Sequence, residues 1–373
     1  MNSISTTTVE ICQFCPMKKF LTIFLILFTV ACNTSTEVDE NPPTRPYKNI
    51  RGEAQGTTYS ITYVGDSIDR QTAIDSMLAL YDQDLSLWVE GSLINSVNEF
   101  DRTDTVFTFY DQSRFFFPTV FEISREIWMR TDGAFDPTVY PLVELWGFGL
   151  KNRTVVNQER VDSALQYVGF EPAKIDMLDL LEDNRYKETQ IRKGAAGVKL
   201  DFNAIAQGYS VDRIAGMLTD WGYSDFMIEI GGELLCKGLN PQSKPWTIGI
   251  DKPEQSADRE SFQAIIQPGN RALATSGSYR KFYEENGKKY SHAINPKTGY
   301  PVDHNVLSVT VLANTCAEAD AYATAFLVMG LEGINEFLSS HAELGLEVYV
   351  IFDSGNGTLE TLVSPGFEAL LVK

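Results

Sequence analysis

Two oxygen-bearing side chains, Asp320 and Thr324, stand four residues apart in a segment whose apolar spacing predicts a helix from near Ala317. Side chains at that spacing project from one face of a helix. A carboxylate and a hydroxyl are hard oxygen ligands that suit Mg²⁺, whose shell backbone carbonyls and substrate phosphates can complete. The alternative is that Asp320 only stabilises the helix N-terminus while Thr324 packs inward.

The segment 274–301 carries His292, one of three histidines in the chain. Its polar residues are interrupted by Gly and Pro and follow neither the helical nor the strand period. Folded proteins use such loops for recognition or chemistry, and histidine is a common proton acceptor. The alternative is a solvent-exposed hairpin whose histidine caps a backbone group.

Two shorter motifs add carboxylates. Asp201 opens a strand-to-helix junction that contains Gly208, and Asp136 lies in a Gly-Ala-Phe-Asp-Pro turn. Junctions of the first kind present backbone groups and side chains to a cleft. The alternatives are a helix cap by Asp201 or Asn203 and a plain Asp-Pro turn. The body of the chain has no P-loop, dinucleotide-binding, zincin or hydrolase signature.

The elements that must position these residues follow no regular βαβ order, which predicts an α+β fold with flanking helices. Gly231-Gly232 either turns a strand or lets a backbone approach a ligand. The polar segment 151–195 shows one helix and little else. Strands are expected at 57–64, 198–200, 226–230, 246–250, 307–312, 348–352 and 359–363, and helices near 74–85, 92–100, 117–131, 157–168 and 204–218 and from 317.

The N-terminus predicts export. Met17 and two lysines precede an apolar run that ends at Cys32 and is too short for a comfortable transmembrane helix. The sequence Thr-Val-Ala-Cys resembles a bacterial lipobox, whose cysteine is lipidated and becomes the first residue. We therefore expect residues 1–31 to be a signal peptide; an ordinary cleaved signal peptide is the alternative.

The signal pattern begins at Met17, so residues 1–16 look like an upstream mis-start. Their removal would also remove Cys12 and Cys15, whose spacing otherwise suggests redox or metal chemistry. Residues 32–49 read as a lipidated N-terminus and a flexible tether, and residues 50–373 as the globular body.

The net charge and the cysteines limit which ligands the chain can bind. The net charge of −19 and the pI of about 4.6 argue against nucleic acid and imply that a cation mediates contact with any phosphate substrate. Cys236 follows an apolar strand and Cys316 opens a helix, so two buried free thiols are expected. A zinc site is poorly supported.

In their order, the motifs closely resemble the ApbE family, the FAD:protein FMN transferases. This resemblance implies an ApbE-like fold of mixed sheets with flanking helices, and an active site in a cleft between two lobes. The matching segments are GTTY at 56–59, SLINSVN at 92–98, GAFDPTVYPLVELWGFG at 133–149, DFNAIAQGYSVD at 201–212, IEIGGELLCKG at 228–238, ATSGSYRKFY at 274–283, SHAINPKTGYP at 291–301 and EADAYATAFLVMG at 318–330.

The resemblance implies a reaction in which Mg²⁺ and FAD bind in the cleft, a threonine hydroxyl of a target protein attacks the FMN-side phosphorus, and AMP departs. Acceptors of the family carry the motif Asp-x-x-Thr-Gly-Ala-Thr/Ser and belong to membrane redox complexes such as NQR and Rnf. The family is exported, often as a lipoprotein, which agrees with Cys32 and predicts an anchor on the periplasmic side of the inner membrane.

The family pattern also implies site residues. His292 matches the base or acceptor-orienting histidine. The metal pattern falls on Asp320, Thr324 and the backbone carbonyls of Ala204 and Ala323. The flavin-nucleotide pattern falls on Gln55, Trp88, Ala134, Phe135, Asp136, Asp201, Gln207 and Ile294.

Four positions depart from the family pattern. Gln55 replaces the usual methionine, Trp88 the usual tyrosine, Gln207 a common Lys or Glu, and Asn295 the usual Asp. Trp88 can still stack on a flat ring, whereas Gln207 removes a charge near the nucleotide. Two alternatives are open: an Mg²⁺-dependent FAD pyrophosphatase that releases FMN and AMP, as in relatives in which water replaces the hydroxyl, and a non-catalytic FAD-binding lipoprotein, for which the altered Gln55 and Gln207 leave room.

Overall fold

The computed structural model describes residues 45–111, 115–150, 155–183, 186–253, 262–278, 282–285, 288–355 and 357–372. All of them belong to Pro42–Lys373, one of the two units into which the chain divides. The predicted signal peptide, Cys32 and most of the predicted tether lie outside the described residues. In the described part, no helix has the length and apolar character needed to span a membrane.

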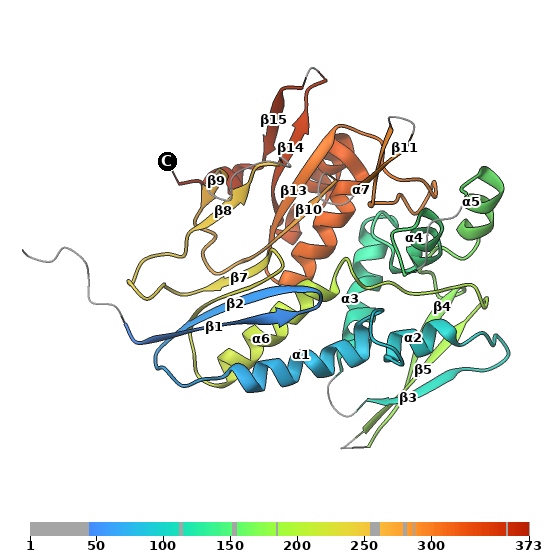
Figure 1. The fold of residues 1–373 in the computed structure, drawn as a ribbon, viewed down its shortest axis with the longest axis horizontal. Helices are drawn as coiled ribbons and strands as arrows, with labels where there is room; N and C mark the ends of the chain where they lie inside the picture. Colours follow the sequence, from blue (N-terminus) through green and yellow to red (C-terminus); the bar gives the residue numbers. More distant parts are fainter. Residues whose placement is uncertain are drawn as a thin grey trace, which may run out of the picture. The chain divides into compact units, whose positions relative to one another are not determined.

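Alternating burial builds the largest sheet, in which neighbouring strands pair antiparallel. In the strand at Asp225–Ile230, for example, every second residue is buried, as expected for a strand with one face on the core. The strands across the sheet are β1 (Tyr47–Ala54), β2 (Thr57–Val64), β6 (Asp225–Ile230), β7 (Glu233–Lys237), β10 (Ala272–Gly277), β13 (Val306–Ala313), β14 (Glu347–Asp353) and β15 (Leu359–Val363) (Figure 1).

Two tight turns lie side by side at one end of this sheet. Gln55 and Gly56 connect β1 to β2, and both have positive φ (54° and 74°), as a type I′ hairpin turn requires. Gly231 and Gly232 connect β6 to β7, also with positive φ (63° and 114°). The Gly231 N–H donates to the carbonyl of Thr58 in the neighbouring strand (3.2 Å). The glycine pair therefore does turn a strand, and it brings this turn next to Gln55.

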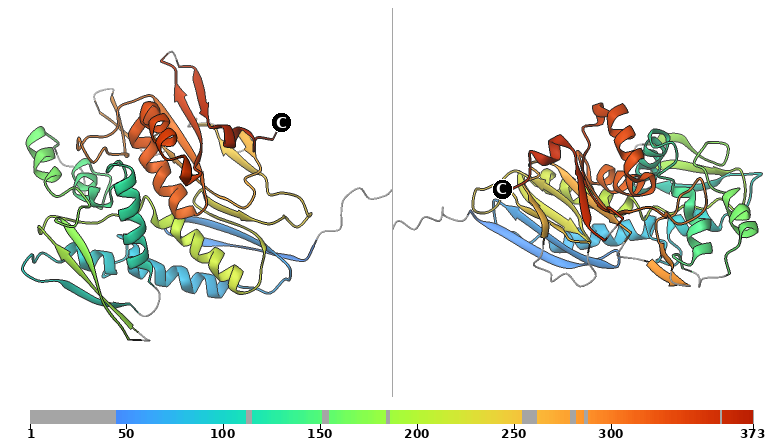
Figure 2. Two further views of the ribbon diagram at one scale, coloured as in Figure 1. Left: turned by 180° about the vertical axis from the view of Figure 1, so that it is seen from behind. Right: turned by 90° about the horizontal axis from the view of Figure 1, so that it is seen from above.

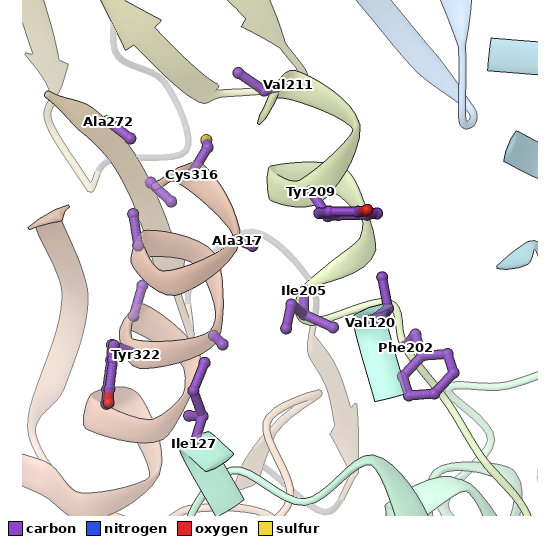
Figure 3. Packing of buried hydrophobic residues seen from close by; sticks show 14 of the residues in the cluster. Val120, Ile127, Phe202, Ile205, Tyr209, Val211, Ala272, Cys316, Ala317 and Tyr322 are labelled. Carbon is purple, nitrogen blue, oxygen red and sulfur yellow. The ribbon is translucent and has the colours of Figure 1, made fainter. Parts of the chain in front are cut away.

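Two helices, α6 (Ala206–Asp220) and α7 (Cys316–Ser340), pack on this sheet and on each other (Figure 2). Their apolar side chains meet those of α3 (Phe116–Arg130) in the main core (Figure 3). A Cβ on Gly208 would lie 2.3 Å from the carbonyl oxygen of Cys316, so only glycine permits this approach. The free thiols of Cys236 and Cys316 are buried, as predicted.

A second sheet, with the strand order β3-β5-β4, was not predicted from the sequence. It consists of β3 (Phe107–Asp111), β5 (Tyr186–Lys193) and β4 (Ile175–Asp183), and β5 contacts the end of α2 (Leu93–Glu99) through Lys193. The strand predicted at 198–200 is wrong. This segment has no strand pairing, and at Leu200 the side chain of Asn98 in α2 binds the backbone groups that a neighbouring strand would bind.

The predicted α+β class is confirmed, with several sheets and flanking helices. Residues Pro42–Lys373 form one compact unit, so the expected cleft between two lobes stays a prediction. The predicted helix at 157–168 is shorter, and the predicted strand at 246–250 begins two residues later. The remaining elements are α1 (Gln71–Leu85), η1 (Pro137–Val139), α4 (Tyr140–Trp146), α5 (Gln158–Leu165), β8 (Ile248–Asp251), β9 (Phe262–Ile266), β11 (Phe282–Glu285), β12 (Lys288–Ser291), η2 (Ala342–Leu344) and α8 (Pro365–Glu368).

Candidate active site

Helices α6 and α7 cap each other with carboxylates. Asp212 of α6 accepts the N–H groups of Cys316 (2.7 Å) and Ala317 (2.8 Å), the first two residues of α7. In return, Asp320 of α7 accepts the N–H of Gly208 in the first turn of α6 (3.0 Å). Both carboxylates therefore lie where unpaired N–H groups and the helix dipole favour negative charge.

Burial raises the pKa values of this pair. Asp320 is only 6% exposed, and loss of hydration raises its pKa to about 7, with the nearby charge of Asp212 adding to the effect. Burial likewise raises the pKa of Asp212 to about 7, against the lowering effect of its two N–H donors. A cation beside Asp320 would favour its ionised form, since opposite charges lower a carboxyl pKa.

Two other predicted metal ligands, Thr324 and the Ala204 carbonyl, belong to α7 and to the segment just before α6. Thr324 lies one turn further along α7, and its hydroxyl is 3.0 Å from that of Ser276 on β10. In a longer α6, the Gly208 N–H would donate to the Ala204 carbonyl four residues earlier. It donates to Asp320 instead. Asp320 therefore lies against the first turn of α6, Thr324 lies one turn further along α7 beside Ser276, and Ala204 lies two residues before α6; that the three share one metal stays a prediction.

This donor set suits Mg²⁺, which binds oxygen and usually keeps waters or substrate phosphates in its shell. The described residues contain no cluster of three or more His, Cys, Asp or Glu side chains that could hold a metal alone. A metal here would thus depend on hydroxyl, carbonyl and ligand oxygens beside the single carboxylate of Asp320. Ala323 is fully buried within α7, so its carbonyl could contribute only the lone pair not used by the helix.

The turn that carries Asp136 is packed tightly. One oxygen of Asp136 accepts from the N–H and the hydroxyl of Thr138 (2.7 and 2.5 Å), and the other accepts from the Trp128 indole (3.0 Å). Burial still raises its pKa to about 6. Ala134 and Phe135 are 9% and 2% exposed, so both residues are buried around this turn.

Asp201 is tied to the same turn. Its N–H donates to the carbonyl of Pro137 (2.7 Å), and its carboxylate accepts the N–H of Asn203 (2.8 Å). Burial raises the pKa of Asp201 to about 6. The Asn203 contact is the cap-like bond considered from the sequence, whereas the Pro137 contact joins two predicted flavin segments that lie far apart in the chain.

The two glutamines that depart from the family pattern lie on either side of Ser210. Its hydroxyl donates to the backbone carbonyl of Gln207 (2.7 Å) and to the side-chain oxygen of Gln55 (3.3 Å). The side-chain amide of Gln207 also lies against Gly231, where a Cβ would be 2.5 Å from Nε2. Both predicted nucleotide residues are therefore near the first turn of α6, as is Asp320.

The loop around His292 packs on a separate apolar cluster. The His292 ring is edge-on to the Phe148 ring, with centroids 6.4 Å apart, and Ile294 is 5% exposed in the cluster of α4 and α5. Asn295 accepts the N–H groups of Lys297 (2.9 Å) and Thr298 (3.3 Å) through its side-chain oxygen. An aspartate could accept the same bonds, so this departure leaves the turn intact.

Trp88 stands on the surface, 66% exposed, in the loop before α2. Asn95 holds this loop, because its side-chain amide donates to the carbonyls of Leu87 (3.0 Å) and Val89 (2.9 Å). The ring is thus presented by a fixed loop, although the hydrogen bonds described above do not connect Trp88 or His292 to Asp320.

Sequence reasoning did not single out Ser210, Ser276, Asp212 or Asn98, which all act through contacts distant in sequence.

The model of the ApbE family matches residues 55–350, most of the chain. The chain belongs to the ApbE family. A Vibrio cholerae protein named FAD:protein FMN transferase is 37% identical over 291 residues, which are 76% of this chain and 82% of that protein. A Haemophilus influenzae protein of the same name is 32% identical over 366 residues, 95% of this chain and 99% of that protein.

Solved ApbE structures share the fold. The flavin transferase ApbE from Vibrio cholerae has a TM-score of 0.74 and 34% identity, and the match covers 88% of this chain and all of that one. The ApbE protein from Thermotoga maritima has a TM-score of 0.72 and 27% identity, with 88% and 100% coverage. The family match spans Gln55, Asp201, His292 and Asp320 together, so they belong to one ApbE body.

Proposed function

We propose that this protein transfers FMN from FAD to a threonine hydroxyl of an acceptor protein and releases AMP. The curated relatives are FAD:protein FMN transferases, and the family match extends over residues 55–350. The threonine oxygen forms a bond to the FMN-side phosphorus while the bond from that phosphorus to the AMP oxygen breaks. The hydroxyl proton passes to a base, and the product is a phosphoester.

The observation that carries this proposal is the position of Asp320. It lies buried against the first turn of α6, and Thr324, one turn further along α7, forms a hydrogen bond with Ser276. A bound Mg²⁺ would neutralise pyrophosphate charge and stabilise the departing AMP, which an acidic chain needs for such a substrate. Asp320, Thr324 and the Ala204 carbonyl would hold it, with Ala323 as a further carbonyl.

The remaining residues receive roles from the family resemblance and from their surroundings. Trp88 offers an exposed ring for stacking, while Asp201, Gln207 and Gln55 hold the nucleotide near the start of α6. Ala134, Phe135, Asp136 and Ile294 complete the nucleotide set. His292 accepts the proton of the incoming threonine, the role of a general base.

We further propose that the protein acts at a membrane surface. Lipidation of Cys32 would anchor it on the periplasmic side of the inner membrane, with residues 33–49 as the tether. Its acceptor would carry Asp-x-x-Thr-Gly-Ala-Thr/Ser, as in subunits of NQR and Rnf complexes. A globomycin-sensitive increase in mass at Cys32 in cells would support the anchor, and an unmodified mature Cys32 would exclude it.

Incubation of the full-length protein in detergent with FAD, Mg²⁺ and an acceptor protein tests the activity. We expect an FMN mass adduct on the acceptor, no adduct when the motif threonine is changed to valine, and loss of turnover with retained FAD binding in His292→Ala. Release of free FMN at the same rate with and without acceptor would identify a pyrophosphatase instead. FAD binding without either product would identify a storage protein.

A further inference from the structure

The second sheet reaches toward the active site through one buried lysine. Lys193, the last residue of β5, is 1% exposed. Its ammonium lies 2.8 Å from the carbonyl oxygen of Phe100, 3.3 Å from that of Val97 and 3.5 Å from that of Asn98. These are the last carbonyls of α2, which have no partners within the helix. Lys193 therefore caps the C-terminus of α2.

A buried lysine is unusual and must be compensated. Burial and the nearby charge of Lys199 lower the pKa of Lys193 to about 8, while Asp101 acts in the opposite direction. The carbonyl oxygens supply what hydration would otherwise supply, and a cation at a helix C-terminus also interacts favourably with the helix dipole. The contacts of the Lys193 ammonium with these carbonyls fix the position where α2 ends.

Asn98 lies at this end of α2, and its side chain binds both the backbone N–H and the backbone carbonyl of Leu200. Its side-chain oxygen accepts the Leu200 N–H (2.7 Å), and its side-chain amide donates to the Leu200 carbonyl (2.8 Å). Asn98 is 6% exposed and Leu200 is fully buried, so water does not compete for these bonds. The next backbone group in the chain, the Asp201 N–H, is bound to the Pro137 carbonyl.

The Leu200 N–H, the Leu200 carbonyl and the Asp201 N–H are therefore all bound, by Asn98 and Pro137, just before the Asp201 side chain. We propose that Asn98 is a positioning residue that sets the location of Asp201 for nucleotide binding, and that Lys193 holds the helix end from which Asn98 acts. This inference rests on the proposed role of Asp201 in holding FAD. It gives the second sheet a part in the reaction, although that sheet contributes none of the predicted site residues.

A double-mutant cycle on the full-length protein tests the proposal, with the FAD dissociation constant measured by flavin fluorescence and the Tm measured for each variant. We expect Asn98→Ala to weaken FAD binding about tenfold in the wild-type background but less than about twofold when Asp201 is already Ala, since residues that act through one another are not additive. Val97→Ala is the matched control. It removes a fully buried neighbour on α2 and should lower Tm while its effects on FAD binding add to those of Asp201→Ala.

Lys193→Met provides a second route if Asn98→Ala does not fold. It should weaken FAD binding in the wild-type background and, like Asn98→Ala, should have little further effect beside Asp201→Ala. Additive effects in both cycles, or weakening that only follows Tm as in Val97→Ala, would overturn the inference. If Asp201→Ala itself leaves FAD affinity unchanged, then the role of Asp201 is wrong and the inference falls with it, whereas FMN transfer by the wild type still stands.

Discussion

The two sides of the candidate site hold their aspartates in different ways. Asp320 lies within a long helix and is bound by the N–H of Gly208 on the neighbouring helix. Asp201 lies between regular elements; Asn98 binds the backbone of the preceding residue, Leu200, and the Pro137 carbonyl accepts the Asp201 N–H. The helix side depends on how closely two rigid elements pack, whereas the loop side depends on individual hydrogen bonds. The two sides should therefore fail differently when mutated.

The largest effect is expected on the helix side, at the carboxylate. Asp320→Asn keeps the side-chain size and an oxygen that can accept the Gly208 N–H, but it removes the charge that would hold Mg²⁺. We expect FMN transfer to fall about a thousandfold, because metal stabilisation of phosphoryl transfer amounts to several kcal/mol. The rate of adduct formation by mass spectrometry, with Tm alongside, measures this. A rate within tenfold of the wild type would remove Asp320 from the chemistry.

Helix packing gives the next largest effect. Gly208→Ala would place a Cβ 2.3 Å from the Cys316 carbonyl, so α6 and α7 must separate. We expect a loss of about 3 kcal/mol in the free energy of unfolding, at the upper end for overpacking. Gly216→Ala in the same helix is the matched control, since nothing lies within 4 Å of its Cβ, and it should raise stability by up to about 1 kcal/mol. Equal effects of the two substitutions in urea unfolding would contradict the packing argument.

The loop side should respond to pH through Asp136. Its pKa in the folded protein is raised to about 6 by burial, whereas the unfolded chain keeps a value near 3.8. Its contribution to stability is therefore fully present below the unfolded pKa of about 3.8 and is lost as pH rises through about 6, a total change of about 3 kcal/mol. We expect Asp136→Asn to lack this change. Urea unfolding of both proteins from pH 4 to pH 7 measures the difference, and parallel curves would show that Asp136 does not titrate in this range.

The smallest effect is expected at Asn295. Its side-chain oxygen accepts the N–H groups of Lys297 and Thr298, and an aspartate oxygen would accept them equally well. We expect Asn295→Asp to keep FMN transfer within about twofold and to change stability by less than about 0.5 kcal/mol. A large gain in rate would instead show that the usual Asp has a chemical role that this chain lacks.

The same contrast explains what the sequence predicted. The main sheet and its helices follow apolar periods, and the four-residue spacing of Asp320 and Thr324 was enough to place them on one face. In β5, the buried residues Thr189, Ile191 and Lys193 do alternate, but two of the three are polar, so the strand gave no apolar signal. Hydrophobicity cannot reveal a strand whose buried positions include a lysine that caps a distant helix.

On the loop side, the sequence pattern marked Asp201 and Asp136 as candidates, but it did not show what holds them in place. The sequence Val-Lys-Leu at 198–200 was interpreted as a strand, yet the Val198 N–H bonds to the Ala195 carbonyl and the Leu200 backbone bonds to the side chain of Asn98. Local pattern cannot show that an amide side chain replaces a strand. Similarly, Ser276 meets Thr324 only because β10 passes beside α7, a contact between residues 48 positions apart.

The reciprocal caps of α6 and α7 also bear on how an acidic protein tolerates buried charge. Among the described ion pairs, none gives Asp212 or Asp320 a Lys or Arg partner; their neutralising groups are backbone N–H groups at two converging helix ends. Such partial charges belong to the main chain, cannot swing away, and are sheltered from salt. No basic side chain needs to be displaced before a cation approaches Asp320. Binding of the metal should therefore depend little on ionic strength, although the chain as a whole carries a net charge of −19.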